Sequence, residues 1–177
     1  MAYNVNKDGG KLHIFLGISA LVCFLASSSI LPFFDKGAPG GVPDAMLCFV
    51  CALPAFTDIK KGGIYALCLG FAADLFVTPP TSLSPFVFLL CMCLSYACLK
   101  HFSRVGSLAI AICTLPSFAV KSLVSAIITS LTVDGVNLWK AITNIPFMSF
   151  ISNFACAIVV AFVMRLISKK MRINTHN

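Results

Sequence analysis

Residues 106–131 read GSLAIAICTLPSFAVKSLVSAIITSL, and Lys121 is the only charged side chain in this stretch. A helix of this length reaches across the hydrocarbon core of a bilayer, which needs about 20 apolar residues. The whole chain has the same character, with 59% hydrophobic and 11% charged residues, whereas about a quarter of the residues in soluble domains are charged. The stretch and the composition together predict an all-α integral membrane protein.

Outward from this stretch, the chain divides into six apolar runs separated by short polar breaks. The runs are Leu12–Phe34, Val42–Phe56, Gly63–Val77, Leu83–Leu99, Gly106–Leu131 and Ile145–Ile167. The second and third are short for a full crossing, so we expect two short helices that are buried by their neighbours. We therefore predict one polytopic membrane domain over residues 1–177 with six transmembrane helices. In the alternative there are four crossings, and the short pair is re-entrant.

Basic residues are divided unequally between the two sides that six spans create. One side receives ten of them and the other side two: Lys7, Lys11, Lys60, Lys61, Lys100, Arg104, Arg165, Lys169, Lys170 and Arg172, against Lys36 and Lys140. Cytoplasmic loops carry the excess of lysine and arginine in membrane proteins, so we expect both termini in the cytoplasm. The net charge of +7 then reflects orientation in the lipid bilayer, and no nucleic acid is expected as a partner.

Two parts of the chain outside these central runs need a separate interpretation. The first run follows Lys7 and Lys11 like a signal peptide, but it exceeds the roughly 7–15 residues of a signal core, so we expect it to stay as a span. The outward connection Thr132–Asn144 carries the only tryptophan, Trp139. This connection predicts a short helix lying in the headgroup layer.

Of the charged side chains in the apolar runs, Asp74 in the third and Lys121 in the fifth lie farthest from the ends. Such residues are costly in a membrane and are functional candidates for that reason. With both runs directed outward, Asp74 lies about 6 Å and Lys121 about 15 Å below the outer edge, and a lysine stem reaches toward the interface. We predict that the two form an intramembrane ion pair. The sequence leaves open a direct role of either residue in a partner-binding or ligand-binding site.

Small residues accompany Asp74 along its helix. Ala66 and Gly70 precede it at four-residue spacing, and small residues at this spacing let another helix approach closely. We therefore expect Ala66 and Gly70 to serve helix packing and the carboxylate of Asp74 to point into protein.

Asp44 follows Pro43 at the start of the second run. Proline presets the backbone for the first turn of a helix, and an acid near a helix N-terminus suits the macrodipole. We interpret Asp44 first as a helix-terminus residue, with a binding role as the alternative.

Patterns of catalytic residues are missing from the sequence. The three histidines lie at or beyond the ends of the runs, without an H-E-x-x-H motif, and there is no G-x-S-x-G motif. All nine cysteines fall inside apolar runs, where they act as small hydrophobic residues, and no histidine or carboxylate accompanies their short spacings within a run. We expect no catalytic residue, metal or cofactor, and a protein that is not an enzyme.

Residues 43–102 contain a recognisable succession of motifs. Pro43-Asp44 opens an apolar helix that reaches Ala52-Leu53-Pro54, then Gly63…Gly70-Phe71…Asp74-Leu75 follows a short basic turn, and Ser82-Leu83-Ser84-Pro85-Phe86 opens the next helix. This succession, with the overall length, basic ends and span count, resembles the MreD family of bacterial rod-shape-determining proteins. The chain departs from the family at Val77-Thr78-Pro79-Pro80, where glycine and small residues are common, so the shape of that outer loop does not follow from the family.

The resemblance implies a non-catalytic scaffold subunit of the cell-elongation machinery in the bacterial cytoplasmic membrane. Its expected partner is a bitopic MreC-like protein and, through it, the glycosyltransferase–transpeptidase pair that inserts peptidoglycan into the side wall. The resemblance also implies a fold similar to the substrate-binding subunits of energy-coupling-factor transporters.

A vitamin-binding subunit of such a transporter is the alternative function. Those subunits usually carry Ala-x-x-x-Ala in the first span, which reads LGISALVCFLASSS here and has no such pair. A vitamin pocket also needs several converging polar residues, whereas Asp44, Asp74 and Lys121 are the charged candidates. The scaffold is therefore the preferred prediction.

Overall fold

The computed structural model describes residues 9–27, 43–76, 83–102, 106–132, 137–143 and 147–170, and within these ranges it contains helices and no strand. The prediction of an all-α fold is thereby confirmed for the described residues. The elements are α1 (Gly9–Leu25), α3 (Ala45–Ala52), the 3-10 turn η2 (Leu53–Ala55), α4 (Ile59–Phe76), α5 (Ser84–Leu99), α6 (Ser107–Thr132), α7 (Leu138–Thr143) and α8 (Phe147–Lys170).

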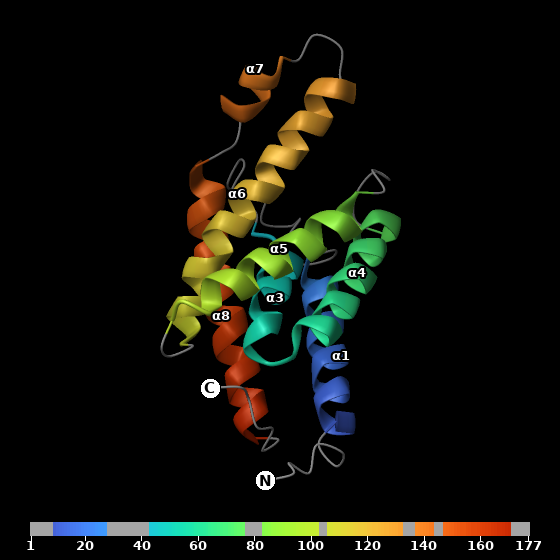
Figure 1. The fold of residues 1–177 in the computed structure, drawn as a ribbon, viewed down its shortest axis with the longest axis vertical. Helices are drawn as coiled ribbons and strands as arrows, with labels where there is room; N and C mark the ends of the chain where they lie inside the picture. Colours follow the sequence, from blue (N-terminus) through green and yellow to red (C-terminus); the bar gives the residue numbers. More distant parts are fainter. Residues whose placement is uncertain are drawn as a thin grey trace.

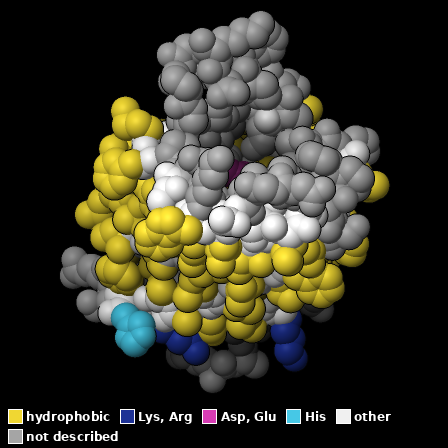
Figure 2. Space-filling view, turned by 90° about the horizontal axis from the view of Figure 1, so that it is seen from above, with side chains coloured by type: hydrophobic (Ala, Val, Ile, Leu, Met, Phe, Trp, Pro, Cys, Tyr) yellow, Lys and Arg dark blue, Asp and Glu magenta, His cyan; other side chains and the backbone are white. Residues whose placement is uncertain are grey.

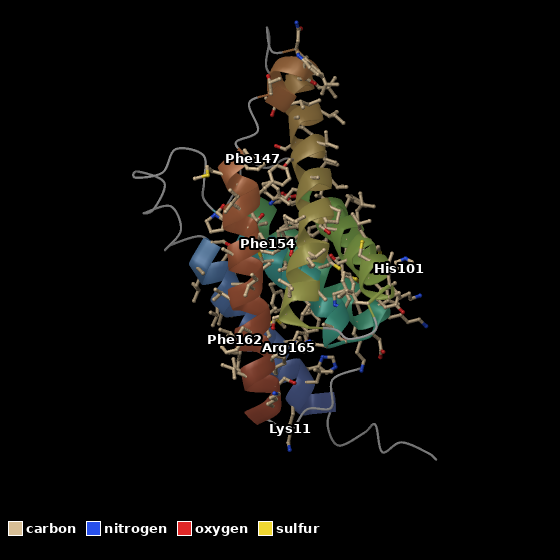
Figure 3. The ribbon with its side chains drawn as sticks, turned by 90° about the vertical axis from the view of Figure 1, so that its left-hand side faces the viewer. Lys11, His101, Phe147, Phe154, Phe162 and Arg165 are labelled. Atoms are coloured by element: carbon tan, nitrogen blue, oxygen red, sulfur yellow. The ribbon has the colours of Figure 1, made fainter. Side chains whose placement is uncertain are left out.

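Successive helices alternate in direction along one axis (Figure 1). In that view α1, α4 and α6 run upward, and α3, α5 and α8 run downward, with α5 crossing α3 obliquely. The start of α1 and the end of α8 therefore lie at the same end. Figure 3 shows Lys11 and Arg165 near that end, while Phe147 marks the opposite end of α8.

The short helix α3 forms the centre of the bundle. All eight of its residues are buried, and α1, α5, α6 and α8 pack around it. Its length of about 12 Å is less than half the thickness of a bilayer core. The second apolar run thus forms a short helix covered by its neighbours, and its residues are apolar on every side because no side of the helix meets solvent.

The third run differs from its predicted bounds. Helix α4 begins at Ile59 and ends at Phe76, with 18 residues, so Lys60 and Lys61 belong to its first turn and do not form a separate basic turn. Lysine is a good helix former, and the amide of Gly62 already donates to the carbonyl of Asp58. The extra turn makes α4 longer than the apolar run alone indicated.

Two helices in the described part of the chain are long and apolar enough to cross a membrane. They are α6, and α8 over Phe147–Lys169, and only 33% and 28% of the residues in their most apolar windows are buried inside the protein. A core helix of a soluble protein would be mostly buried, so these helices present apolar side chains outward. Figure 2 shows hydrophobic side chains over much of the visible surface, with lysine and arginine at one edge.

The short helix predicted in the Thr132–Asn144 connection is α7, which packs against α6 and leaves Trp139 exposed. Figures 1 and 3 show α7 beside the far end of α6, beyond the start of α8.

Candidate functional site

Asp44 begins α3 as its N-cap. Its backbone is extended, with φ −94° and ψ 93°, and its Oδ1 accepts a hydrogen bond of 3.0 Å from the amide of Leu47. This bond satisfies one of the donors that a helix leaves open at its start. The structure thus gives Asp44 the helix-terminus role that the sequence favoured.

The second carboxylate oxygen of Asp44 binds Lys121. The ammonium of Lys121, on α6, donates to Oδ2 and forms an ion pair with it. The same ammonium lies 5.1 Å from the ring centroid of Phe88, a cation–π distance. The side chains of Lys121 and Asp44 are 34% and 19% exposed, so the ion pair is only partly buried.

This pairing corrects the one predicted from the sequence. Lys121 was expected to meet Asp74, but it binds Asp44, and neither carboxylate oxygen of Asp74 has a hydrogen-bond partner among the described residues. The physical reason lies in the packing: α6 contacts α3, whereas α4 packs chiefly against α5. Asp74 and Lys121 therefore belong to different helix pairs.

Asn153 on α8 completes this site, and sequence reasoning missed it. Its Oδ1 accepts a 2.8 Å hydrogen bond from the backbone amide of Asp44, and its Nδ2 donates to the carbonyl of Ser149 at 2.7 Å. Its backbone carbonyl also accepts from the thiol of Cys48 at 3.4 Å. Asn153 is buried. The signal that could have revealed it is an amide side chain in the first half of the largely apolar sixth run.

Asp44, Lys121 and Asn153 together form what we call the polar cluster, and it ties three helices together. One residue comes from the start of α3, one from the second half of α6 and one from α8. Hydrogen bonds between helices have little competition from water inside an apolar bundle, so they fix helix positions. The arrangement is suited to holding α3 in place at its first residue.

A second polar contact, separate from the polar cluster, joins α5 to α6. The hydroxyls of Ser95 and Ser117 lie 3.0 Å apart, and the Ser117 hydroxyl also lies within donating distance of the carbonyls of Cys91 and Cys113. Both serines are fully buried. They add a directional link to a helix pair that is otherwise held by apolar packing.

Asp74 lies near the end of α4 and is 9% exposed. Ala66 is fully buried on the same helix, and Gly70 lies directly against the start of α5. A Cβ on Gly70 would overlap the backbone of Pro85 and would lie 2.9 Å from the carbonyl carbon of Ser84. The small residues thus allow α4 and α5 to approach at backbone distance, with Asp74 one turn farther along.

Within the described ranges no three histidine, cysteine, aspartate or glutamate residues gather in a way that could hold a metal ion, and the nine cysteines are free thiols. Comparisons with protein-family models, with curated proteins and with solved structures give no significant match to this chain.

Proposed function

We propose that this chain is a six-span protein of the bacterial cytoplasmic membrane that acts as a non-catalytic scaffold in side-wall peptidoglycan synthesis. The observation that carries the proposal is the alternation of helix directions in one bundle, with α1 beginning and α8 ending at the same end. Lys11 and Arg165 lie toward that end. Together with the ten-to-two distribution of basic residues in the sequence, this arrangement supports a cytoplasmic location for both termini.

The use of the polar residues supports a scaffold. The carboxylate of Asp44 is engaged by Leu47 and Lys121, and the side chain of Asn153 is engaged by Asp44 and Ser149. These groups hold the chain's own helices together. A subunit that binds a polar vitamin needs converging polar groups that remain available to the ligand.

The resemblance to the MreD family supports the choice of machinery and of an MreC-like bitopic partner. The motif residues have clear structural tasks here: Asp44 caps α3, and Gly70 meets Pro85 where α4 and α5 pack. A family likeness carried by such residues concerns the architecture of the bundle, which is what a scaffold contributes.

A vitamin-binding transporter subunit is the second candidate, and the partial exposure of Lys121 favours it. A lysine that is 34% exposed between apolar helices is a polar group that a ligand can contact. Its two N–H donors beyond the ion pair with Asp44 would be the contact points.

Depletion of the protein in a rod-shaped host tests the two candidates against each other. The scaffold predicts rounded or swollen cells with mislocalised wall synthesis, and cell-wall proteins should co-purify with the chain in mild detergent. Unchanged cell shape with loss of vitamin uptake, or co-purification of a transport ATPase, would refute it. Orientation is tested separately: a reporter that works only in the cytoplasm should be active after Asn177 and inactive at Gly40, and the reverse would overturn the orientation.

A further inference from the structure

Asp74 is a buried carboxylate, and no described residue forms an ion pair or hydrogen bond with it. Neither of its oxygens is accessible or has a hydrogen-bond partner there. Lys121, the cation predicted to meet it, is engaged by Asp44. Intramembrane carboxylates almost always pair with another group, so a partner group is expected from outside the described residues.

The position of Asp74 in α4 is a second factor that is unfavourable for a negative charge. The helix ends at Phe76, so Asp74 lies in its last turn, where the open carbonyl groups already carry partial negative charge. Burial without a hydrogen bond and proximity to the helix C-terminus both disfavour a carboxylate at this point. An approaching cation would relieve both, because it would be attracted by the side chain and by the end of the helix.

We propose that Asp74 is the docking point for a lysine or arginine on a transmembrane helix of a partner protein. The proposal rests on the membrane-scaffold part of the proposed function and specifies the chemistry of the partner. Charge complementarity identifies the occupant as a helix with a cation near the outer end of its span, at the level of the last turn of α4. Lysine and arginine fit this level because their long stems let the charge reach toward the interface.

The outer face of α4 provides the surface on which such a helix would lie. Helix α4 packs chiefly against α5 and only lightly against α1 and α3. Its opposite face carries an exposed stripe at helical spacing, which we call the α4 stripe and which consists of Ile64, Cys68, Phe71 and Leu75. Phe71 and Leu75 are 61% and 76% exposed and lie three residues before and one residue after Asp74. Asp74 itself therefore lies at the edge of the α4 stripe, on the side toward α5.

Lipid alone does not account for this arrangement. An apolar stripe in contact with lipid needs no carboxylate at its edge, and a structural aspartate would be expected to have a partner within the bundle, as Asp44 has. The combination of an unpartnered acid and an uncovered apolar face is what a helix with one cation would match.

Photo-crosslinking in cells tests the proposal. A benzoylphenylalanine at Phe71 or at Leu75 should capture a protein whose transmembrane helix carries a lysine or arginine near its outer end, as identified by mass spectrometry. The matched control is the same probe at Val159, a mostly exposed position on α8. Asp74→Asn should reduce the protein adduct at Phe71 by about tenfold or more, as expected for one partner of a buried charge pair, and should leave any adduct at Val159 unchanged.

A charge exchange gives the decisive result. Asp74→Lys should abolish the adduct, and replacing the partner's cation by aspartate should restore it. Adducts with lipid only, a captured helix without a cation at that level, or an adduct that Asp74→Asn does not reduce would each overturn the proposal.

Stability in detergent separates docking from an internal role. Since no described residue pairs with Asp74, Asp74→Asn should leave the thermal midpoint of the isolated protein unchanged or raise it. A lowered midpoint would assign Asp74 to the internal fold and overturn the proposal. If docking at Asp74 fails, the cell-shape test of the proposed function still stands on its own. A captured partner that is unrelated to wall synthesis would refute the proposed function and leave the docking site in place.

Discussion

Breaking the ion pair between Asp44 and Lys121 should weaken the fold by an amount that the geometry bounds. Lys121→Met keeps an unbranched apolar stem and removes the ammonium, so Oδ2 of Asp44 loses its partner while Oδ1 keeps its bond to Leu47. Breaking a fully buried pair costs about 3–5 kcal/mol, and exposed pairs contribute about 0–1 kcal/mol. Side chains that are 19% and 34% exposed lie between these limits, so we expect a loss of about 2 kcal/mol in the free energy of unfolding.

The partner variants separate the two roles of Asp44. Asp44→Asn retains a good N-cap and removes the charge, so it should cost about 1–2 kcal/mol through the stranded ammonium. Asp44→Ala also removes the cap and should cost about 1 kcal/mol more. Because the double variant Asp44→Asn with Lys121→Met strands no charge, it should cost about 1–2 kcal/mol less than the two single losses added.

Free energies of unfolding are measured by titrating the purified protein with SDS in mixed micelles. The control is a second cycle with Asp74→Asn and Lys121→Met, which should be additive because no contact joins these residues. Additivity in the Asp44 cycle together with coupling in the Asp74 cycle would refute the pairing described here.

Two further changes address helix packing. Gly70→Ala should destabilise the protein by about 2 kcal/mol or more, since its Cβ would overlap the backbone of Pro85. The control Gly17→Ala, at a position with open space around it, should be neutral or stabilise by about 0.5–1 kcal/mol. Equal effects of the two substitutions in the same SDS titration would contradict the close approach of α4 to α5. Asn153→Leu should cost about 1–3 kcal/mol, because the partly buried backbone amide of Asp44 loses its acceptor. Thermal unfolding in detergent that matches the wild type would show that the hydrogen bond does not hold α3 to α8.

Residue type and run length were sufficient to predict part of this structure. The all-α class, the short buried helix over the second run and the helix start at Asp44 all follow from which residues are apolar and from the position of proline and aspartate at the start of that run. These features depend on local sequence. Gly70 also indicated the close packing of α4, because a residue without a side chain allows another backbone to lie against it. That backbone is the start of α5.

The pairing of charges could not be predicted in the same way. Topology gives each residue a depth in the membrane, and Asp74 and Lys121 were matched by depth alone. Contact also requires the lateral order of the helices and their rotation about their axes, which a single sequence does not reveal. Asn153 went unnoticed for a related reason: an uncharged amide does not stand out until the amide of Asp44 is placed against it.

The complete burial of α3 has a consequence for biogenesis. In the proposed topology, the second apolar run, Val42–Phe56, has 15 residues, fewer than the about 20 that a segment needs to partition into the bilayer by itself during synthesis. The helices that enclose α3 include α5, α6 and α8, and all three follow it in the chain. The contacts between α3 and α8, including the hydrogen bond from the amide of Asp44 to Asn153, can form only after α8 has been synthesised. Until then the nascent chain must keep an unplaced hydrophobic segment from aggregating, and truncation before α8 should leave the protein a substrate for membrane proteolysis.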